Sequence, residues 1–327
     1  MLMTVQTDRR SLFKLAGVTA VALATPQIMV RKAFAETMAM PAATAFNQFK
    51  LGEFTVTTVN DGSTVMENPQ GTFGTDQSVE TVSDLLQANY LPTEKLVNGF
   101  APTVVNTGSD IVLFDTGLGE GARGKGMGQL SARMAAAGIK PEDVTVVVIT
   151  HMHPDHIGGL MEGGSPAFPN ARYVTGQAEY DFWSDSARAG TPAEGVHKLV
   201  QAKVVPLADK MTFIADGGEV VPGITGMAAP GHTPGHMIYR MESGGRQLVV
   251  TADTANHFIL SLQRPEWEVR FDMDKATAAK SRKMVFDMIA TDRLPFIGYH
   301  MPFPSVGFVE AMDTGYRFIP ETYQFDL

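Results

Sequence analysis

The chain of 327 residues contains no cysteine. This absence excludes disulfide bonds, a cysteine nucleophile and thiolate metal ligands. A chain of this length still buries a sizeable core without cross-links, and it corresponds to one large domain or two small ones. Any metal site must therefore be built from histidine, aspartate and glutamate side chains.

Positive charge is also in short supply, with 26 Lys and Arg against 35 Asp and Glu and a formal net charge of -9. An acidic surface repels phosphate backbones, so nucleic acid is not expected as a partner. The one long apolar run, residues 15–30, contains Pro26 and is shorter than the roughly 20 residues that span a bilayer. We therefore expect no stable membrane anchor.

Residues 1–35 have the pattern of an export signal. Arg9 and Arg10 precede the apolar run, and residues 33–35 (Ala-Phe-Ala) place small side chains at both key positions of a signal-peptidase site. Paired arginines are typical of a bacterial twin-arginine signal, which exports folded proteins. We expect cleavage after Ala35, a single hydrolase domain over residues 36–327 and a periplasmic or secreted protein. An uncleaved anchor or an unstructured tail is the alternative.

Strand and helix patterns alternate along the rest of the chain and predict a layered α/β protein with two sheets. Strands are predicted at residues 54–59, 103–106, 111–114, 144–149, 172–175, 224–229, 237–241, 247–250 and 295–299, and helices at residues 78–90, 129–138 and 275–290. His151, His232, Asp253 and His300 each lie just past the end of a predicted strand. Because function commonly collects on loops held by a rigid scaffold, we expect the active site there.

Residues 151–156 (His-Met-His-Pro-Asp-His) carry the clearest chemical signal. In an extended segment, residues two apart point the same way, so His151 and His153 are placed to bind one ion together. Asp155 and His156 follow a proline and are placed to turn toward a second ion. A solvated polar loop is the alternative, whereas an HExxH helix is excluded because no glutamate follows the first histidine.

This segment resembles the HxHxDH signature of the metallo-β-lactamase superfamily. Four further motifs follow the family's order, at residues 115–117 (Asp-Thr-Gly), 231–236 (Gly-His-Thr-Pro-Gly-His), 251–253 (Thr-Ala-Asp) and 298–300 (Gly-Tyr-His). The resemblance implies an αββα sandwich, in which two mixed β-sheets lie face to face and helices cover the outside.

The resemblance also implies two divalent metal ions and places their ligands. One ion would be held by His151, His153 and His232, the other by Asp155, His156 and His300, and Asp253 would bridge both. Imidazole and carboxylate ligands favour zinc and tolerate cobalt, manganese or iron. Two such ions about 3.5–4 Å apart share a hydroxide with a pKa near 7, which would attack the substrate directly. Asp155 and Asp253 would assist catalysis by orienting this hydroxide or accepting its proton.

Asp115 and His236 are expected to orient the metal ligands without binding the metal themselves. Asp115 would fix the tautomer of a ligating histidine, although a turn-forming aspartate is the alternative. His236 would orient the loop that carries His232. His197 is not expected to bind metal.

The ligand types narrow the class of reaction. A glutamate in place of His153 would indicate a redox di-iron site, so the histidine indicates hydrolysis. True β-lactamases of the superfamily lack a bridging carboxylate at Asp253, which argues against penicillin as the substrate. We expect hydrolysis of a small-molecule lactone or carboxylic (aryl) ester. A phosphotriesterase is the alternative, and a metal-binding protein without catalysis is a third candidate.

Within the superfamily the chain is most similar to the methyl parathion hydrolase and lactonase branch. The export signal, residues 60–62 (Asn-Asp-Gly) and residues 298–304 carry this finer resemblance. The glycine-rich loop at residues 117–128 lacks the aromatic side chain expected of a dedicated organophosphate hydrolase, which favours a lactone or aryl ester. The resemblance also implies a homodimer.

Aromatic side chains near the ligand loops are candidates for the substrate pocket, although such residues also serve as core. In enzymes of this branch an aromatic wall follows the histidine cluster. The pocket candidates are Phe182 and Trp183, with His257, Phe258 and Phe303 adding further surface.

Overall fold

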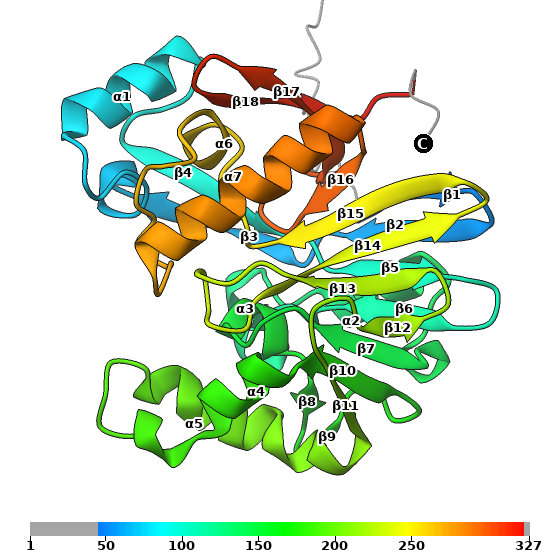
Figure 1. Cartoon of the computed structure of the whole chain (residues 1–327). Helices are drawn as coiled ribbons and strands as arrows, with labels where there is room; N and C mark the ends of the chain where they lie inside the picture. Colours follow the sequence, from blue (N-terminus) through cyan, green and yellow to red (C-terminus); the bar gives the residue numbers. More distant parts are fainter. Residues whose placement is uncertain (1–44, 324–327) are drawn as a thin grey trace, which may run out of the picture. The chain divides into compact units, whose positions relative to one another are not determined.

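The computed structural model describes residues 45–323, so the predicted export signal lies outside the described residues. Two seven-stranded sheets pack face to face in this part of the chain (Figure 1). Apolar side chains of both sheets meet between them, among them Val56 and Val148 from one sheet and Tyr239 and Val250 from the other. The predicted sandwich of two mixed sheets is confirmed.

The first sheet has the strand order β1-β2-β5-β6-β7-β10-β11. Its strands are β1 (Phe46–Leu51), β2 (Phe54–Val59), β5 (Thr103–Asn106), β6 (Ile111–Phe114), β7 (Val146–Ile149), β10 (Arg172–Gly176) and β11 (Met211–Ile214). The four strands from β1 to β6 pair antiparallel, and β6, β7, β10 and β11 pair parallel. Side chains of β7 alternate between two apolar clusters, so this strand is buried on both faces, as its continuous apolar run predicts.

The second sheet has the order β12-β13-β14-β15-β16-β17-β18 and is antiparallel except between β15 and β16. Its strands are β12 (Glu219–Val221), β13 (Ile224–Ala228), β14 (Met237–Ser243), β15 (Arg246–Ala252), β16 (Phe296–Gly298), β17 (Val306–Met312) and β18 (Gly315–Pro320). Two short pairs lie outside the main sheets: β3 (Gly62–Glu67) with β4 (Lys95–Phe100), and β8 (Met161–Glu162) with β9 (Ser165–Pro166).

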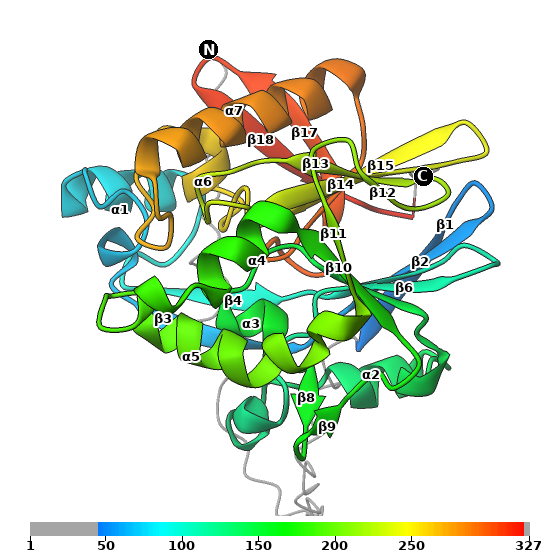
Figure 2. The ribbon, with the colours of Figure 1, turned by 60° about the horizontal axis from the view of Figure 1, so that its bottom comes forward.

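Helices cover the outer faces of both sheets (Figure 2). They are α1 (Val79–Ala88), α2 (Leu130–Ala136), α3 (Pro154–Ile157), α4 (Gln177–Ser184), α5 (Glu194–Lys203), α6 (Leu260–Gln263) and α7 (Lys275–Asp292). The first sheet packs against α2, α4 and α5, and the second sheet packs against α7 through Val285, Phe286 and Ile289. None of the helices within residues 45–323 has the length and apolarity to cross a membrane.

The predicted strands and helices are confirmed, with end points that differ by a few residues. Ser78 caps α1, because its hydroxyl accepts a hydrogen bond from the backbone N–H of Thr81. The sequence patterns do not predict α4 and α5. Helix α4 begins directly after β10 without a polar capping side chain, and α5 contains Gly195, which weakens a helix signal.

Candidate metal centre

The side chains expected to bind metal come together at the ends of the buried strands. His151 and His153 follow β7, and the short helix α3 carries Asp155 and His156. His232 follows β13, and Asp253 and His300 follow β15 and β16. Ala252, the last residue of β15, and Asp115, which follows β6, have positive φ angles of 43° and 59°. Such backbone conformations are unfavourable for residues other than glycine and cluster at functional sites.

Four of these side chains form the first group: His151, His153, His232 and Asp253. Their ligand atoms all lie within 4.8 Å of one another. Nδ1 of His153 lies 3.1 Å from Nε2 of His151 and 2.9 Å from Nε2 of His232. Oδ2 of Asp253 lies 3.3 Å from Nε2 of His232.

The second group contains Asp155, His156 and His300 and adjoins the same aspartate. Oδ2 of Asp155 lies 3.5 Å from Nε2 of His156 and 3.4 Å from Nε2 of His300. Asp253 contributes Oδ2 at 3.1 Å from Nε2 of His300 and Oδ1 at 3.2 Å from Nε2 of His156. One carboxylate therefore contacts both groups, which is the position expected of a bridging ligand.

Two observations show that this site fits a pair of divalent cations. Nε2 of His156 and Oδ1 of Asp253 are fully buried, lie close together and have no hydrogen-bond partner. Buried polar atoms without a partner are rare because leaving water is costly. The nitrogen atoms of three histidines also face one another, an arrangement that a shared cation stabilises.

In the absence of metal, burial and neighbouring charges shift the pKa values of the histidines in opposite directions. Burial lowers the pKa of His153 to about 3, with a further contribution from His232, and holds the pKa of His151 well below its usual range. Burial also opposes a charge on His232, but the hydrogen bonds that it donates to Asp253 and Asp272 raise its pKa to about 9. Without metal the centre thus holds neutral rings at His151 and His153 and a protonated ring at His232, so metal binding must release the proton of His232.

Asp115 and His236 hold the candidate ligands, as the sequence predicts. Oδ2 of Asp115 lies 2.8 Å from Nδ1 of His156, and the same carboxylate accepts hydrogen bonds from the backbone N–H and the hydroxyl of Thr150. Nε2 of His236 accepts a hydrogen bond from the backbone N–H of Asp253, and its Nδ1 donates to the carbonyl of Ala229. His236 therefore supports the strand end that carries Asp253 rather than His232 alone.

Two buried carboxylates that the sequence analysis missed also support the centre. Asp272 accepts hydrogen bonds from Nδ1 of His232 and from the guanidinium of Arg282. Glu179, on α4, accepts hydrogen bonds from four donors in three loops or helices: Met152 N–H, the Trp183 indole, the Thr233 hydroxyl and Gly235 N–H. Glu179 lies one helical turn before Trp183, so the two side chains share one face of α4. This spacing is the sequence signal that the face is buried.

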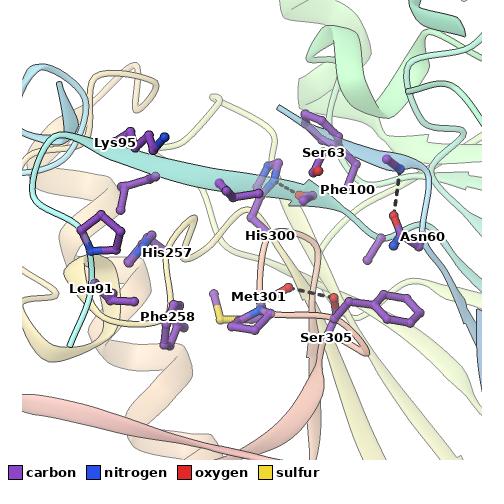
Figure 3. A pocket seen from close by; sticks show the side chains of 18 residues that line it. Asn60, Ser63, Leu91, Lys95, Phe100, His257, Phe258, His300, Met301 and Ser305 are labelled. Atoms are coloured by element: carbon purple, nitrogen blue, oxygen red, sulfur yellow. Dashed lines mark hydrogen bonds between the residues drawn. The ribbon is translucent and has the colours of Figure 1, made fainter. Parts of the chain in front are cut away.

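A cavity of about 470 Å³ adjoins the centre at His300 (Figure 3). Its wall is largely apolar and includes three of the predicted pocket residues, His257, Phe258 and Phe303. His300 connects the two features, because its Nε2 faces Asp253 and its Nδ1 donates a hydrogen bond to the carbonyl of Gly99 in the cavity wall.

The predicted pocket role of Phe182 and Trp183 is wrong for this cavity, since neither residue lines it. Trp183 is 2% exposed and belongs to the core between the first sheet and its helices. Its indole N–H donates a hydrogen bond to Glu179, and its ring makes an edge contact with the ring of His153. Phe182 packs against the same core under the guanidinium of Arg188. Both rings therefore pack in the core around α4 and not in the cavity wall.

His197, predicted not to bind metal, is absent from both ligand groups. Its Nδ1 lies 2.8 Å from the carbonyl oxygen of Trp183, so it connects α5 to α4. This contact accounts for its burial without a metal ion.

Comparison with known proteins gives a consistent result. The chain is 27% identical over 164 residues to an N-acyl homoserine lactonase of Bacillus cereus, a match that covers 50% of this chain and 58% of the relative. Among solved structures it is similar to AidC, a dizinc quorum-quenching lactonase in complex with a homoserine product, with a TM-score of 0.77 and 26% identity over 86% of this chain and 99% of AidC. It is also similar to the hydrolase AbOPH, with a TM-score of 0.78 and 25% identity over the same shares of the two chains.

The family model of the metallo-beta-lactamase superfamily matches residues 102–290, which include six of the seven candidate ligands. His300 lies beyond this range but joins the same cluster in space. The match covers more than half of the chain, and the two-sheet fold agrees with it. The chain therefore belongs to the metallo-beta-lactamase superfamily, a family of metal-dependent hydrolases.

Proposed function

We propose that this protein hydrolyses lactones, with N-acyl homoserine lactones as the leading candidates and carboxylic aryl esters as further substrates. One observation carries the proposal: a centre of seven histidine and aspartate side chains adjoins a largely apolar cavity through His300. The lactonase relatives support it, although the Bacillus cereus enzyme is matched over only 58% of its length.

The two residue groups would hold two divalent metal ions, with Asp253 shared between them. When bound, such a pair supplies Lewis acidity and a hydroxide nucleophile at neutral pH. We propose zinc as the native metal because imidazole and carboxylate donors favour it, and the dizinc site named for AidC supports that choice.

Asp155 is the carboxylate of the centre that a substrate reaches most easily. Its side chain is 20% exposed, whereas that of Asp253 is 4% exposed. The Tyr299 hydroxyl donates a hydrogen bond to the backbone carbonyl of Asp155, and the Tyr299 ring packs on His156. Asp155 is thus held in place at the open side of the centre, where its Oδ2 can orient water or accept the proton released during ester cleavage.

The apolar cavity wall would hold the non-reacting part of the substrate. Phe258 and Phe303 contribute aromatic surface, and Phe100 packs with its ring edge against His300. Burying an apolar substituent there removes water from the neighbourhood of the ester and fixes its orientation toward the centre.

Three finer proposals follow from the sequence. Export by the twin-arginine pathway would deliver the folded enzyme to the periplasm or the medium, where diffusing lactones are accessible. A phosphotriester such as paraoxon would be a secondary substrate, as the resemblance to the methyl parathion hydrolase branch suggests. The enzyme would act as a homodimer.

The decisive experiment is a substrate panel on the purified, zinc-reconstituted protein, using N-hexanoyl homoserine lactone, phenyl acetate and paraoxon. We expect kcat/KM to be at least about tenfold higher for the lactone than for either other substrate, because one well-matched pocket contact gives discrimination of that order. Chelator-treated protein, the control, should lose activity and regain it with zinc. Activity confined to paraoxon, or no hydrolysis at two bound zinc ions per chain, would contradict the proposal.

A further inference from the structure

His257 is the one imidazole in the cavity wall that belongs to neither metal group within residues 45–323. It is 6% exposed and lies among apolar side chains (Figure 3). The rings of Phe73 and Phe258 flank it, with centroids 5.5 Å and 5.0 Å away. The imidazole is therefore held in one orientation beside the space that a substrate would occupy.

Backbone contacts determine which nitrogen of His257 carries the proton. Nδ1 accepts hydrogen bonds from the backbone N–H groups of Ile259 at 3.1 Å and Leu260 at 3.0 Å. A nitrogen that accepts two hydrogen bonds is unprotonated, so the hydrogen of the neutral ring is on Nε2. Burial lowers the pKa of His257 to about 3, which keeps the ring neutral at physiological pH.

The Nε2–H group has no protein acceptor within the described residues, because the side-chain hydrogen bonds of His257 all involve Nδ1. This donor belongs to a residue of the cavity wall and is not among the fully buried polar atoms, so in the free protein a water molecule would satisfy it. A ligand that displaces this water with a purely apolar group leaves the donor unpaired. A ligand that places an oxygen acceptor there does not.

We infer that His257 is a substrate-positioning residue that donates its Nε2–H to a carbonyl oxygen on the substituent of the bound lactone or ester. This inference rests on the proposed function, and it narrows the substrate class. Lactones with an acyl-amide substituent would bind well, whereas lactones with a plain alkyl chain of similar length would bind less well.

Two substitutions separate this role from the structural role of the ring. Asparagine places an acceptor at the position of Nδ1, so His257→Asn keeps the contacts to Ile259 and Leu260 but loses the donor that faces the cavity. Glutamine places an N–H near the position of Nε2, so His257→Gln keeps the donor and weakens the backbone contacts. N-Octanoyl homoserine lactone and γ-dodecalactone, which carries an alkyl chain without an amide, serve as matched substrates.

We expect His257→Asn to raise KM for N-octanoyl homoserine lactone by about tenfold or more, the cost of one lost hydrogen bond to a buried group, with little change in kcat. KM for γ-dodecalactone should change by less than about twofold, and His257→Gln should stay within about threefold of the wild type for both lactones. Equal effects on the two lactones, or a larger defect in His257→Gln than in His257→Asn, would overturn the inference.

A binding measurement separates failure of this inference from failure of the proposed function. N-Octanoyl cyclopentylamide has the amide and the chain but no ester, so calorimetry reports its binding to the zinc-loaded protein without turnover. Binding that His257→Asn weakens and His257→Gln retains supports the role of His257 even if no lactone is hydrolysed. Lactone hydrolysis without binding of the amide, or with equal binding by the two variants, overturns the role of His257 alone.

Spectra of wild-type protein labelled with ¹⁵N-histidine provide a test that does not depend on the folding of a variant. Addition of the cyclopentylamide should shift the Nε2 resonance of His257 and leave its Nδ1 resonance in place. An Nε2 resonance that does not move at saturating amide would overturn the inference.

Discussion

Nδ1 of His232 lies 2.9 Å from Oδ1 of Asp272, a residue 40 positions further along the chain. The second oxygen of this carboxylate accepts a hydrogen bond of 2.7 Å from the guanidinium of Arg282, on α7. All three side chains are buried. A candidate metal ligand that follows one strand is therefore oriented by Asp272, which is in turn paired with Arg282 on the helix that covers the second sheet.

Removing Asp272 should weaken metal binding without touching a ligand. Asp272→Ala should lower zinc affinity by about 10- to 100-fold, as loss of such outer contacts usually does. It also leaves Arg282 as a buried unpaired charge, which should lower the free energy of unfolding by about 3–5 kcal/mol. Chelator competition and urea unfolding measure the two effects.

The double variant Asp272→Ala/Arg282→Met is the matched control. It removes the unpaired charge, so it should recover much of the stability but none of the zinc affinity. Wild-type zinc affinity in the single variant would contradict the role assigned to Asp272.

Glu179 should be important for stability although it binds no metal. Glu179→Gln converts one acceptor oxygen of the carboxylate into an NH₂ group, which cannot accept the hydrogen bonds that this oxygen receives. Leaving buried donors unpaired should lower the free energy of unfolding by about 2–4 kcal/mol. Glu219→Gln, at an exposed position of β12, is the control and should change it by less than about 0.5 kcal/mol. Similar urea midpoints for the two variants would refute the prediction.

The burial of Asp61 predicts a pH dependence of folding stability that does not involve the metal centre. Its carboxylate is buried and accepts hydrogen bonds from the backbone N–H groups of Leu118, Gly128 and Leu130. Burial nevertheless raises the pKa of Asp61 from 3.8 to about 6. The folded protein then binds a proton that the unfolded chain has released, so this stabilising contribution is present below pH 3.8 and is lost as the pH rises through 6.

The change should amount to about 3 kcal/mol between pH 4 and pH 7, since each pKa unit corresponds to about 1.4 kcal/mol. Asp61→Asn does not titrate, so the difference in stability between wild type and variant isolates the contribution of Asp61. In thermal unfolding, we expect the wild type to lose stability relative to Asp61→Asn as the pH rises. A difference that stays constant over the range would contradict the assignment.

Trp183 and Phe258 should respond to substitution in opposite ways. Trp183→Phe removes the indole N–H that Glu179 accepts and leaves a gap in the core, so it should lower the unfolding temperature and spare KM. Phe258→Leu changes the cavity wall, so it should raise KM for acyl lactones with a smaller loss of stability. Steady-state kinetics together with calorimetry distinguish the two variants. A KM defect confined to Trp183→Phe would instead support a pocket role for Trp183.

The bridging position of Asp253 is tested by metal content. Asp253→Ala removes the carboxylate that contacts both residue groups, so most of the bound zinc and nearly all turnover should be lost. His197→Ala should retain both, because His197 only connects α5 to the Trp183 carbonyl. Elemental analysis of the two purified variants measures their zinc content. Zinc loss in His197→Ala would refute the ligand set.

Local patterns identified half of the 18 strands in the described part of the chain and the segment at residues 151–156 of the metal cluster. This was possible because a buried strand has a continuous apolar run, and because His151 and His153 are brought to one side by the two-residue repeat of an extended chain. The motif order then placed His232, Asp253 and His300, each of which follows its own buried strand. The prediction for Trp183 failed because sequence position does not reveal which way a helical side chain points.

The sequence by itself determined the chemical groups at the centre, since those residues carry their own signature in short segments. Only the tertiary structure decided what holds them and what lies beside them. Asp272 contacts His232 across 40 positions and Glu179 contacts Met152 across 27, while Arg282 acts through Asp272, and no local periodicity marks contacts between residues so far apart in the chain. His257 combines both, because its Nδ1 contacts with Ile259 and Leu260 are local, whereas Phe73, which flanks its ring in the cavity wall, comes from a distant segment that only the fold brings there.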